Sequence, residues 1–549
     1  MLKILGTLFL SVFISTSVYA GEQSTESVPG EYVLKLSIKV SDYSKDDLET
    51  LLNSKIKTVI PDLNIVVVNR AIVELETFVL KELSDNEIIE VAEPNYIYHT
   101  TVTADDPSFK LQWGMKNFGQ EAIPTETQTS PAVIGLAGVD IGIEKAWEIQ
   151  RGSKDIIVAI IDTGVDYNHP DLAANMWVNE VERDGLPGVD DDKNGFIDDI
   201  HGYSFDGKTT DPKDDNGHGT HCAGVIAAQP NNLSGIAGVN WNVKIMPVKF
   251  LDSSGGGSLE NAIKAIDYAI KMGAVILSNS WGGGGASDNL RAAIQRSSDA
   301  GLLFVAAAGN DGQNNDTSGG HFPSSYDVAN ILSVAAVTNR GELATYSNYG
   351  KKLVDVAAPG SNIYSTYIGN TYKSLSGTSM ATPYVTGIAA LLLAQEPQLR
   401  SGDIINRLVQ TSVPLVPLSG KVKSNGIVNA YNALTNTIVP PDPNDPSQWG
   451  KKTISVSSAH PYAKNVSETF EIKIEGAKEM ALFFNLFDTE KKYDTVSIYD
   501  ISGKLVAQLS GSLDETFSPV IPGSYAKIVF QSDNSVEKNG FDITYVSFR

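Results

Sequence analysis

The sequence has almost no cysteine, because Cys222 is the only one among 549 residues. No disulfide can form within the chain, so its stability has to come from packing, chain length or bound ions. Basic residues are also few: 42 Lys and Arg stand against 65 Asp and Glu, a formal net charge of -23. Since binding to phosphate backbones needs clustered Lys and Arg, this balance argues against nucleic acid as a partner. Cys222 itself is expected to be a buried small side chain.

Long apolar runs are missing beyond the N-terminus. A basic start, an apolar stretch over 4–18 and the small-x-small sequence ending at Ala20 predict a signal peptide, residues 1–20. A membrane anchor is the alternative, but the run is short for a hydrocarbon layer about 30 Å thick. We therefore expect a secreted protein, extracellular or periplasmic, that is a monomer without stable membrane insertion after signal removal.

The rest of the chain has the composition of a globular protein, with 42% hydrophobic residues. Residues 31–98 alternate short strand-like and helix-like stretches, which predicts a small α+β unit. Residues 105–437 contain near-continuous apolar runs closed by glycine, with helical windows between them. Such runs are typical of an α/β fold with a doubly wound, mostly parallel sheet covered on both faces, whose ligand sites lie at the carboxyl ends of the strands.

A proline-rich stretch separates this region from the C-terminal part. Four prolines within 439–446 predict an extended linker over 438–452. Residues 453–549 consist of short β-type runs separated by Gly, Asp and Ser turns, which predicts an all-β sandwich.

Three transitions from an apolar run to glycine carry polar residues with chemical potential. Asp162 ends a buried run in Ile160-Ile161-Asp162-Thr163-Gly164, and His218 lies in Gly217-His218-Gly219-Thr220-His221. Ser379 lies in Ser376-Gly377-Thr378-Ser379-Met380, ahead of an apolar helical run. Taken one at a time, these residues have simpler interpretations: a turn aspartate, a pair of metal-binding histidines and a helix N-cap serine.

Together the three segments, in the order Asp, His, Ser and with a fourth, Ala306-Ala307-Ala308-Gly309-Asn310, resemble the subtilisin-like serine proteases. The resemblance covers residues 105–433. It implies that Ser379 is a nucleophile, that His218 is its general base and acid, and that Asp162 orients the imidazole. It also implies that Asn310 donates a hydrogen bond to the developing oxyanion.

The same resemblance implies where an extended peptide substrate binds as an added strand. Flexible surface loops are the alternative to such binding strands. The substrate preference stays open: Trp281 could form an aromatic wall that favours bulky apolar side chains, and Asp311 could favour basic residues. The matching positions are Gly255, Gly256, Gly257, Ser280, Trp281, Gly282 and Gly309.

An acidic segment predicts calcium binding from its spacing alone. Residues 190–199 place oxygen-bearing side chains at positions 1, 3, 5 and 9 of a loop with glycine at position 6, although position 12 is His201 and not Glu. A solvated acidic loop is the alternative. The expected ligand residues are Asp190, Asp192, Asn194, Phe196, Asp198 and Asp199. By resemblance, a second calcium site joins Asp106, Asp171 and Asn232, and Asp211, Asp214 and Asp215 are candidates for a third.

The two ends of the chain also resemble known modules. Residues 21–104 resemble an inhibitory propeptide, with maturation expected between Tyr98 and Asp106; an independent binding domain is the alternative. Residues 453–549 resemble a CUB-like domain without disulfides, in which Asp488, Asp494 and Asp533 are either calcium ligands or surface charges.

The expected function is that of a secreted, calcium-stabilised serine endopeptidase. It is made as a zymogen, inhibited by its own propeptide and directed at protein and peptide substrates. The alternative from another class is a noncatalytic binding protein that keeps the same fold.

Overall fold

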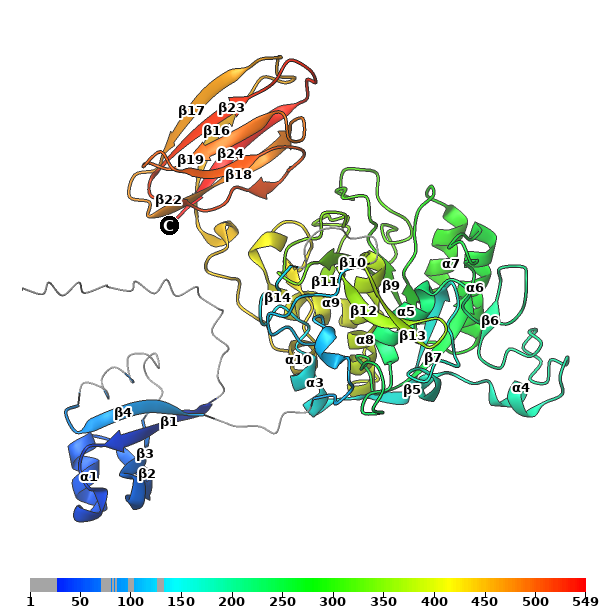
Figure 1. The fold of residues 1–549 in the computed structure, drawn as a ribbon, viewed down its shortest axis with the longest axis horizontal. Coiled ribbons are helices and arrows are strands. Elements are labelled where there is room, and N and C mark those ends of the chain that lie inside the picture. Colours follow the sequence, from blue (N-terminus) through cyan, green and yellow to red (C-terminus); the bar gives the residue numbers. More distant parts are fainter. Residues whose placement is uncertain (1–26, 71–79, 81–82, 84–85, 97–102, 126–132) are drawn as a thin grey trace, which may run out of the picture. The chain divides into compact units, whose positions relative to one another are not determined.

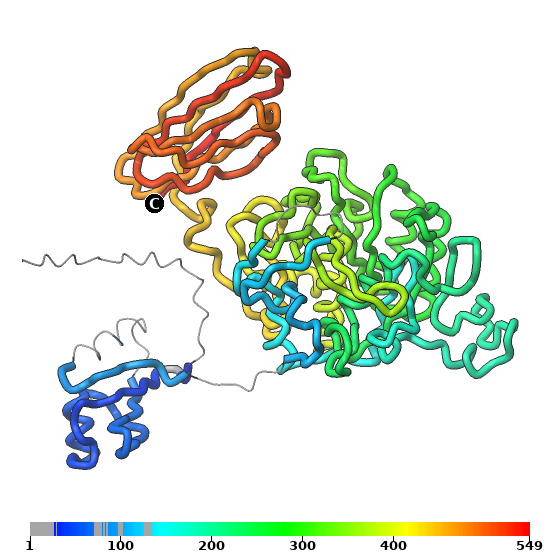
Figure 2. The backbone as a smooth tube through the Cα atoms, in the orientation of Figure 1, coloured from blue at the N-terminus to red at the C-terminus, as the bar shows by residue number. Residues whose placement is uncertain are grey.

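The computed structural model describes residues 27–70, 80, 83, 86–96, 103–125 and 133–549 (Figures 1 and 2). The predicted signal peptide lies outside the described residues, as do 97–102 of the expected maturation region. The chain divides into two compact units, residues 1–101 and 102–549, which are described separately.

The N-terminal unit is an antiparallel sheet with a short helix. Strand order is β2-β3-β1-β4, and α1 begins with a reciprocal cap, because Ser44 Oγ accepts from Asp47 N while the Asp47 carboxylate accepts from Ser44 N. Leu34, Leu48 and Val66 are buried in its core. The elements are β1 (Ser27–Leu36), α1 (Lys45–Leu52), β2 (Lys55–Ile60), β3 (Ile65–Asn69) and β4 (Ile89–Tyr96).

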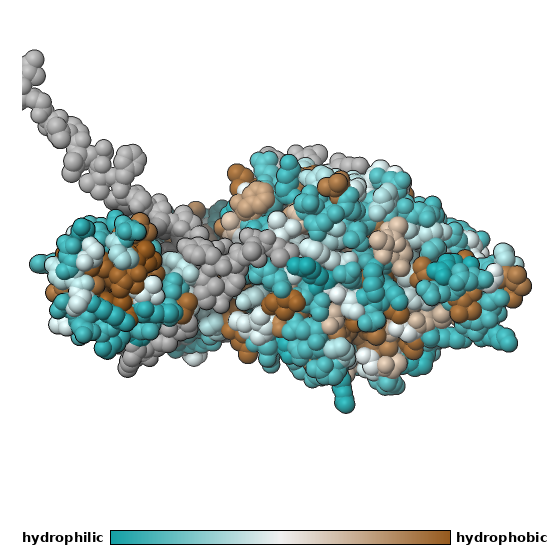
Figure 3. Space-filling view, turned by 90° about the horizontal axis from the view of Figure 1, so that it is seen from below, coloured by the Kyte–Doolittle hydropathy of each residue, from teal (hydrophilic) through white to brown (hydrophobic). Residues whose placement is uncertain are grey.

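Apolar surface gathers on one face of this N-terminal unit in Figure 3. Its exposed large apolar side chains are Tyr43, Leu51, Ile60, Leu63 and Val91.

A nine-stranded sheet organises the second unit, in the order β14-β15-β11-β10-β9-β8-β5-β7-β6. All neighbouring strands are parallel except β14 and β15. The strands are β5 (Gly152–Asp162), β6 (Tyr203–Ser204), β7 (Asn242–Lys249), β8 (Ile276–Asn279), β9 (Leu303–Ala307), β10 (Ile331–Val337), β11 (Val356–Pro359), β14 (Val413–Pro414) and β15 (Gly426–Ile427). A separate hairpin consists of β12 (Ile363–Tyr367) and β13 (Thr371–Leu375).

Helices cover both faces of this sheet, which confirms the predicted doubly wound α/β fold. Along β5, Val158 and Ile160 point into one core while Ala159 and Ile161 point into the other, as the pleat requires. The first core contains α3, α5, α8, α9 and α10, and the second contains α6 and α7. The helices are α3 (Ile143–Ile149), α4 (Glu180–Asp184), α5 (His218–Ala227), α6 (Leu259–Lys271), α7 (Asp288–Asp299), α8 (Thr378–Gln395), α9 (Ser401–Thr411) and α10 (Ala430–Thr435).

The C-terminal part is a sandwich of two antiparallel sheets, as predicted. Aromatic and branched side chains from both sheets, among them Ile472, Phe484, Phe530 and Phe541, fill the space between them. One sheet contains β16 (Gly450–Ser457), β18 (Glu479–Asp488), β21 (Thr516–Phe517), β22 (Ile521–Pro522) and β24 (Gly540–Phe548); the other contains β17 (Ser467–Lys473), β19 (Thr495–Tyr499), β20 (Leu505–Leu509) and β23 (Tyr525–Gln531). Within the described residues, no helix combines the length and the apolar character that a membrane span requires.

Candidate active site

Two of the predicted catalytic side chains meet at the carboxyl end of the central strand. Asp162 is the last residue of β5 and is fully buried, and His218 is the first residue of α5. The Nδ1 atom of His218 lies 2.8 Å from Oδ1 of Asp162, and the N–H of Thr163 donates to the same oxygen at 2.7 Å. Because the carboxylate accepts the Nδ1 proton, Nε2 is left as the basic nitrogen of the ring.

Opposing effects act on the pKa of His218. Burial of the ring disfavours the imidazolium ion, whereas the charge and hydrogen bond of Asp162 favour it, with a smaller contribution from the charge of Asp214. The result is a pKa raised above the ordinary value of 6.5. His218 is therefore a stronger base than a free histidine side chain.

Asp214 fixes the turn that carries His218. One carboxylate oxygen accepts from the N–H groups of Asn216 and Gly217, both at 2.9 Å. The other accepts from the N–H of Thr220 at 2.9 Å and from its hydroxyl at 2.6 Å. Burial nevertheless raises the pKa of Asp214, since the loss of hydration outweighs these hydrogen bonds. The start of α5 is thus held by four hydrogen bonds to one side chain.

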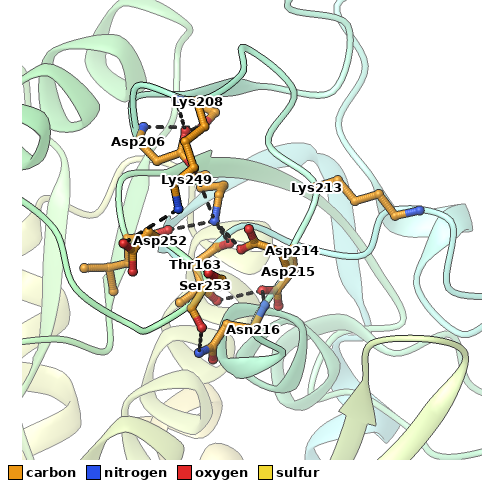
Figure 4. A network of polar contacts seen from close by, with 12 residues as sticks. Thr163, Asp206, Lys208, Lys213, Asp214, Asp215, Asn216, Lys249, Asp252 and Ser253 are labelled. Atoms are coloured by element: carbon orange, nitrogen blue, oxygen red, sulfur yellow. Dashed lines mark hydrogen bonds and ion pairs between the residues drawn. The ribbon is translucent and has the colours of Figure 1, made fainter.

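A buried lysine connects the ends of neighbouring strands beside this turn (Figure 4). Lys249 is the last residue of β7, and its Nζ donates to Asp215 Oδ1 at 2.7 Å. It also donates to the carbonyl oxygens of Thr163 at 2.8 Å and Leu251 at 2.7 Å, and it lies 4.0 Å from Asp206 Oδ2. Sequence reasoning did not single out Lys249, although a charged residue at the end of an apolar run could have marked it.

Ser379 lies in the first turn of α8, beside the Asp162–His218 pair. Its hydroxyl donates to the carbonyl oxygen of Ser280 at 2.9 Å, and the Ser280 hydroxyl donates to the carbonyl of Ser379 at 2.8 Å. The thiol of Cys222 approaches the same carbonyl at 3.5 Å and lies within 4.8 Å of ligand atoms of Asp162 and His218. Among the described residues, no hydrogen bond joins Ser379 Oγ to His218. The hydroxyl must leave Ser280 before it can donate a proton to the imidazole.

Neither Cys222 nor His221 competes for the catalytic roles. Burial raises the pKa of the Cys222 thiol well above its usual value, which keeps it protonated. His221 is fully buried, and burial lowers its pKa to about 3. Its Nε2 lies 2.9 Å from the carbonyl of Ile363 and 3.1 Å from that of Lys373, so this ring holds the β12–β13 hairpin.

Asn310 presents its amide beside the start of α8. Its Oδ1 accepts from the N–H of Thr378 at 2.8 Å and from the hydroxyl of the same residue at 3.0 Å. A Cβ atom added to Gly377 would lie 3.6 Å both from Asn310 Nδ2 and from the N–H nitrogen of Ser379. Two hydrogen-bond donors therefore adjoin one small space next to the Ser379 hydroxyl, which suits addition of that hydroxyl to a carbonyl group.

The predicted substrate-binding glycines differ in what surrounds them. Gly255 and Gly256 are exposed, and a Cβ atom on Gly255 would meet nothing within 4 Å. Gly257 is exposed too, but a Cβ atom on it would lie 2.7 Å from the carbonyl oxygen of Phe250. Asp252 closes the turn by accepting from the N–H of Gly256 at 3.3 Å. An extended chain can therefore approach this loop along 255–256.

Trp281, the candidate aromatic wall, is half-buried. Its ring lies 4.8 Å from that of Phe250 in an edge-on arrangement and packs against the core that contains α6 and α7. The residue that does contact both predicted glycines next to the nucleophile is His321, which no motif marked. Its ring lies against Gly282 and Gly309.

The structure brings the three residues of one predicted calcium site together. Asn232 Nδ2 donates to Asp171 Oδ1 at 2.6 Å, and the N–H groups of Asn231 and Asn232 donate to Asp106 at 2.9 and 3.4 Å. Burial raises the pKa of both Asp106 and Asp171. The charged groups of Asp106 and Asp171 are carboxylates, and calcium prefers oxygen ligands.

In the acidic loop, a carboxylate that sequence reasoning missed joins two predicted ones. Ligand oxygens of Glu182, Asp190 and Asp192 lie within 4.8 Å of one another. Glu182 lies in α4 and is 3% exposed, and no spacing in the sequence marked it as a ligand. The N–H of Asn194 donates to Asp190 at 2.9 Å and to Asp192 at 2.8 Å.

The other predicted residues of that loop have different contacts. Asp198 accepts from the N–H of Gly188 at 2.8 Å. Asp199 accepts from the Tyr268 hydroxyl at 2.7 Å, and its burial raises its pKa. The Phe196 ring packs edge-on against Tyr268, with centroids 4.8 Å apart.

Two further clusters show how acidic residues are used elsewhere. At the candidate third site, Asp215 is paired with Lys249, and Asp211 accepts from the Tyr167 hydroxyl at 3.0 Å. In the C-terminal sandwich, ligand oxygens of Glu490, Asp494 and Asp533 lie within 4.8 Å of one another. Asp488, which was named above with Asp494 and Asp533 as a candidate ligand, pairs with Lys538 at 2.9 Å.

Comparisons with known proteins place two parts of the chain in known families. Residues 153–439 match the profile described as the Subtilase family, and residues 448–545 match the CUB domain. The chain is 36% identical over 357 residues to the thermophilic serine proteinase of Bacillus sp. (strain AK1), covering 65% of this chain and 75% of that protein. It is 39% identical over 290 residues to thermitase of Thermoactinomyces vulgaris, covering 53% and 92%. A solved protease of Pseudoalteromonas arctica PAMC 21717 is 28% identical, covers 61% of this chain and 99% of that one, and has a TM-score of 0.47.

Proposed function

Because the chain belongs to the subtilase family of serine endopeptidases, we propose that Ser379 is its nucleophile and attacks the carbonyl carbon of a peptide bond. His218 takes the hydroxyl proton on Nε2 and returns it to the leaving amine, and Asp162 holds the tautomer and stabilises the imidazolium ion. The observation that carries this assignment is the 2.8 Å contact between His218 Nδ1 and Asp162 Oδ1, next to the turn that holds Ser379. It accounts for both the basicity and the orientation of the ring.

The oxyanion that forms is stabilised by Asn310 Nδ2 and by the N–H of Ser379. Support comes from the fixed amide of Asn310, whose oxygen is held by two hydrogen bonds to Thr378, so that its NH2 group faces the other way. Donors that are already oriented need no rearrangement as the charge develops, which is why they lower the barrier. The substrate chain lies along Gly255–Gly257 on one side and Ser280–Gly282 with Gly309 on the other.

The N-terminal unit acts as an inhibitory propeptide of a secreted enzyme. Its exposed apolar side chains and its compact α+β fold are what a separate unit that covers a cleft requires. Cleavage between Tyr98 and Asp106 would separate it from the second unit, and the signal peptide at 1–20 directs export. The mature enzyme is a monomer that acts on protein and peptide substrates.

Calcium stabilises the protease domain at two places. The first is formed by Asp106, Asp171 and Asn232, and the second by Asp190 and Asp192 with Glu182, in the loop that also contains Asn194, Phe196, Asp198 and Asp199. Support for the second place comes from ligand oxygens of Glu182, Asp190 and Asp192, which lie within 4.8 Å of one another. Support for the first place comes from Asn232, whose side-chain amide donates to Asp171 and whose N–H donates to Asp106. The lack of a second cysteine leaves bound ions as cross-links for these loops.

Replacement of the nucleophile tests this proposal. The full chain and Ser379→Ala should be produced with secretion, and incubated with a fluorophosphonate probe and with casein. We expect the wild type to be labelled at residue 379, to digest casein and to lose its N-terminal unit, as measured by mass spectrometry. Ser379→Ala should lose at least about 10⁴-fold in activity, stay unlabelled and keep the N-terminal unit.

Ser318→Ala, which replaces an exposed serine in the same domain, is a matched control and should behave as the wild type. Thermal unfolding of Ser379→Ala should be close to that of the wild type, because the change removes only one oxygen atom. If Ser379→Ala digested casein as fast as the wild type, the assignment of the nucleophile would be refuted.

A further inference from the structure

Lys249 lies opposite the aspartate of the proposed triad in the central sheet. In the register of β5 and β7, Asp162 is paired with Lys249, and each is the last residue of its strand. The main-chain N–H groups of Phe250 and Leu251 donate to the Asp162 carbonyl at 3.1 and 3.2 Å. The ammonium group of Lys249 donates to the Leu251 carbonyl at 2.7 Å. The chain that leaves β7 is therefore bound both to the end of β5 and to the lysine.

The same ammonium group also links the two segments that carry Asp162 and His218, which we call the carboxylate–imidazole pair. It donates to the carbonyl oxygen of Thr163 at 2.8 Å and to Asp215 Oδ1 at 2.7 Å (Figure 4). Thr163 directly follows Asp162, and Asp215 precedes His218 by three residues. With the bond described above, these contacts use all three donors of an ammonium group. One side chain thus holds the main chain beside both members of the pair.

Burial strengthens the contacts of Lys249. The residue is 1% exposed, and its ammonium group lies 4.0 Å from the buried carboxylate of Asp206, so a second negative charge faces it. Asp206 is fixed in turn, because its Oδ1 accepts from the Ser204 hydroxyl at 3.0 Å and from the N–H of Lys208 at 2.9 Å. Water does not compete for a buried ammonium group, and hydrogen bonds from a charged donor are the stronger ones. The ammonium group is therefore held in one place.

The Thr163 hydroxyl provides a second link between the same two segments. It donates to Asp214 Oδ1 at 2.9 Å and accepts from the N–H of Gly219 at 3.0 Å. These bonds do not involve the ammonium group, so they remain when it is removed. Loss of Lys249 should therefore loosen the carboxylate–imidazole pair without separating it.

We propose that Lys249 is a positioning residue of the protease: its ammonium group sets the distance between Asp162 and His218 by holding the chain beside each of them. The proposal rests on the proposed function. Lys249 acts through the main chain and does not touch the substrate or the reacting atoms. A misplacement of about 1 Å can lower a rate about 10²-fold, so a loosened pair should have a measurable cost in rate.

Replacement of the ammonium group tests the proposal. Lys249→Met keeps an unbranched side chain of similar length but has no donor. With a peptide p-nitroanilide that the wild type cleaves, we expect kcat per reactive site to fall about 10- to 100-fold while KM stays within about threefold. Reactive sites are counted by fluorophosphonate labelling to completion, so unfolded protein does not enter the comparison.

Lys213→Met is the matched control. It removes an ammonium group from the segment that also carries Asp215, but Lys213 is exposed, lies 3.8 Å from Asp166 and points away from the network in Figure 4. Its kcat per reactive site should equal that of the wild type.

The pH profile distinguishes positioning from a direct effect of charge. Loss of a nearby positive charge would raise the apparent pKa of His218, whereas a weaker contact with Asp162 would lower it, because that contact favours the imidazolium ion. We therefore expect the kcat/KM profile of Lys249→Met to move to lower pH. The other titratable groups beside the ring are the same in both proteins: Asp214, His221 and Cys222.

Asp215→Ala decides the question where Lys249→Met does not fold. The Asp215 side chain is 47% exposed, so this variant should fold, and loss of one link should lower kcat per reactive site about threefold or more. An unchanged kcat in Lys249→Met, or a profile that does not move to lower pH, overturns the proposal and leaves the proposed function intact. An unchanged kcat in Asp215→Ala overturns it where Lys249→Met yields no folded protein. A wild type that reacts with neither peptide nor fluorophosphonate overturns both.

Discussion

Carboxylates gather at two places in the protease domain, and the protein neutralises them by different means. Beside the turn that carries His218, Asp206 and Asp215 face the ammonium group of Lys249. In the acidic loop, Glu182, Asp190 and Asp192 converge to within 4.8 Å with main-chain N–H groups as their donors. Over the described residues, no lysine or arginine forms an ion pair with any of those three side chains.

The difference bears on where the proposed calcium acts. Like charges a few ångströms apart repel by several kcal/mol when they are partly removed from water, so a cluster of acids has to be compensated. At the turn that carries His218 the compensating charge is covalently part of the chain. In the acidic loop the proposed calcium would supply the compensation, so we expect that loop to respond to a chelator.

Removal of the internal cation should have the largest effect. Lys249→Met leaves the buried carboxylate of Asp206 without a cation and the carbonyls of Thr163 and Leu251 without their shared donor, and we expect a loss of about 3–5 kcal/mol in the free energy of unfolding. Urea unfolding of the Ser379→Ala protein with and without Lys249→Met measures this loss without self-digestion.

Lys208→Met is the control for this prediction, because Lys208 is exposed and lies 3.8 Å from Asp252. A solvated pair of that kind should contribute no more than about 1 kcal/mol. If both variants were equally stable, the contrast between an internal cation and an external one would be lost.

Much of the protease domain could be predicted from the sequence because its signals are local. Near-continuous apolar runs indicate strands covered on both sides. Asp162 stands where one of these runs ends, and His218 stands where a helix begins. The carboxyl ends of parallel strands lie at one edge of the sheet, where Asp162 stands, and His218 reaches the same place from the start of α5.

The sequence did not predict residues whose role depends on a distant neighbour. Glu182 lies eight residues before the acidic loop and on another element, and His321 lies eleven residues after Asn310 within an irregular segment. The direction of the Trp281 ring depends on Phe250, which comes from a different part of the sheet. No periodicity or spacing encodes such contacts, since they arise only from packing.

Calcium removal should have the second largest effect, and it should act on the acidic loop. A ligand at 100 times its dissociation constant stabilises the folded state by about 2.7 kcal/mol, so excess chelator should lower Tm by several degrees. Differential scanning calorimetry of Ser379→Ala with calcium or chelator measures the change. Asp192→Asn should reduce the difference in Tm between calcium and chelator. Asp184→Asn is the control and should leave this difference unchanged, because Asp184 lies on the same helix as Glu182 but is exposed and paired with Arg183. Equal melting temperatures in calcium and chelator would contradict the view that this loop needs an ion.

The smallest effect in free energy is expected from the pH, and it should be confined to the catalytic turn. Since the pKa of His218 is raised above 6.5 and the neutral ring is the base, kcat/KM should still be rising above pH 6.5, by up to about tenfold per pH unit on the acid side of the pKa. Stability changes in the opposite direction: a pKa raised by folding stabilises the protein below about pH 6.5, and this contribution is lost as the pH rises through the folded-state value. In Asp162→Asn the charge that raises the pKa is gone while burial remains, so the residual activity should rise at lower pH. A rise that is complete below pH 6.5 in the wild type, or one that stays in place in Asp162→Asn, would show that Asp162 does not control the basicity of His218.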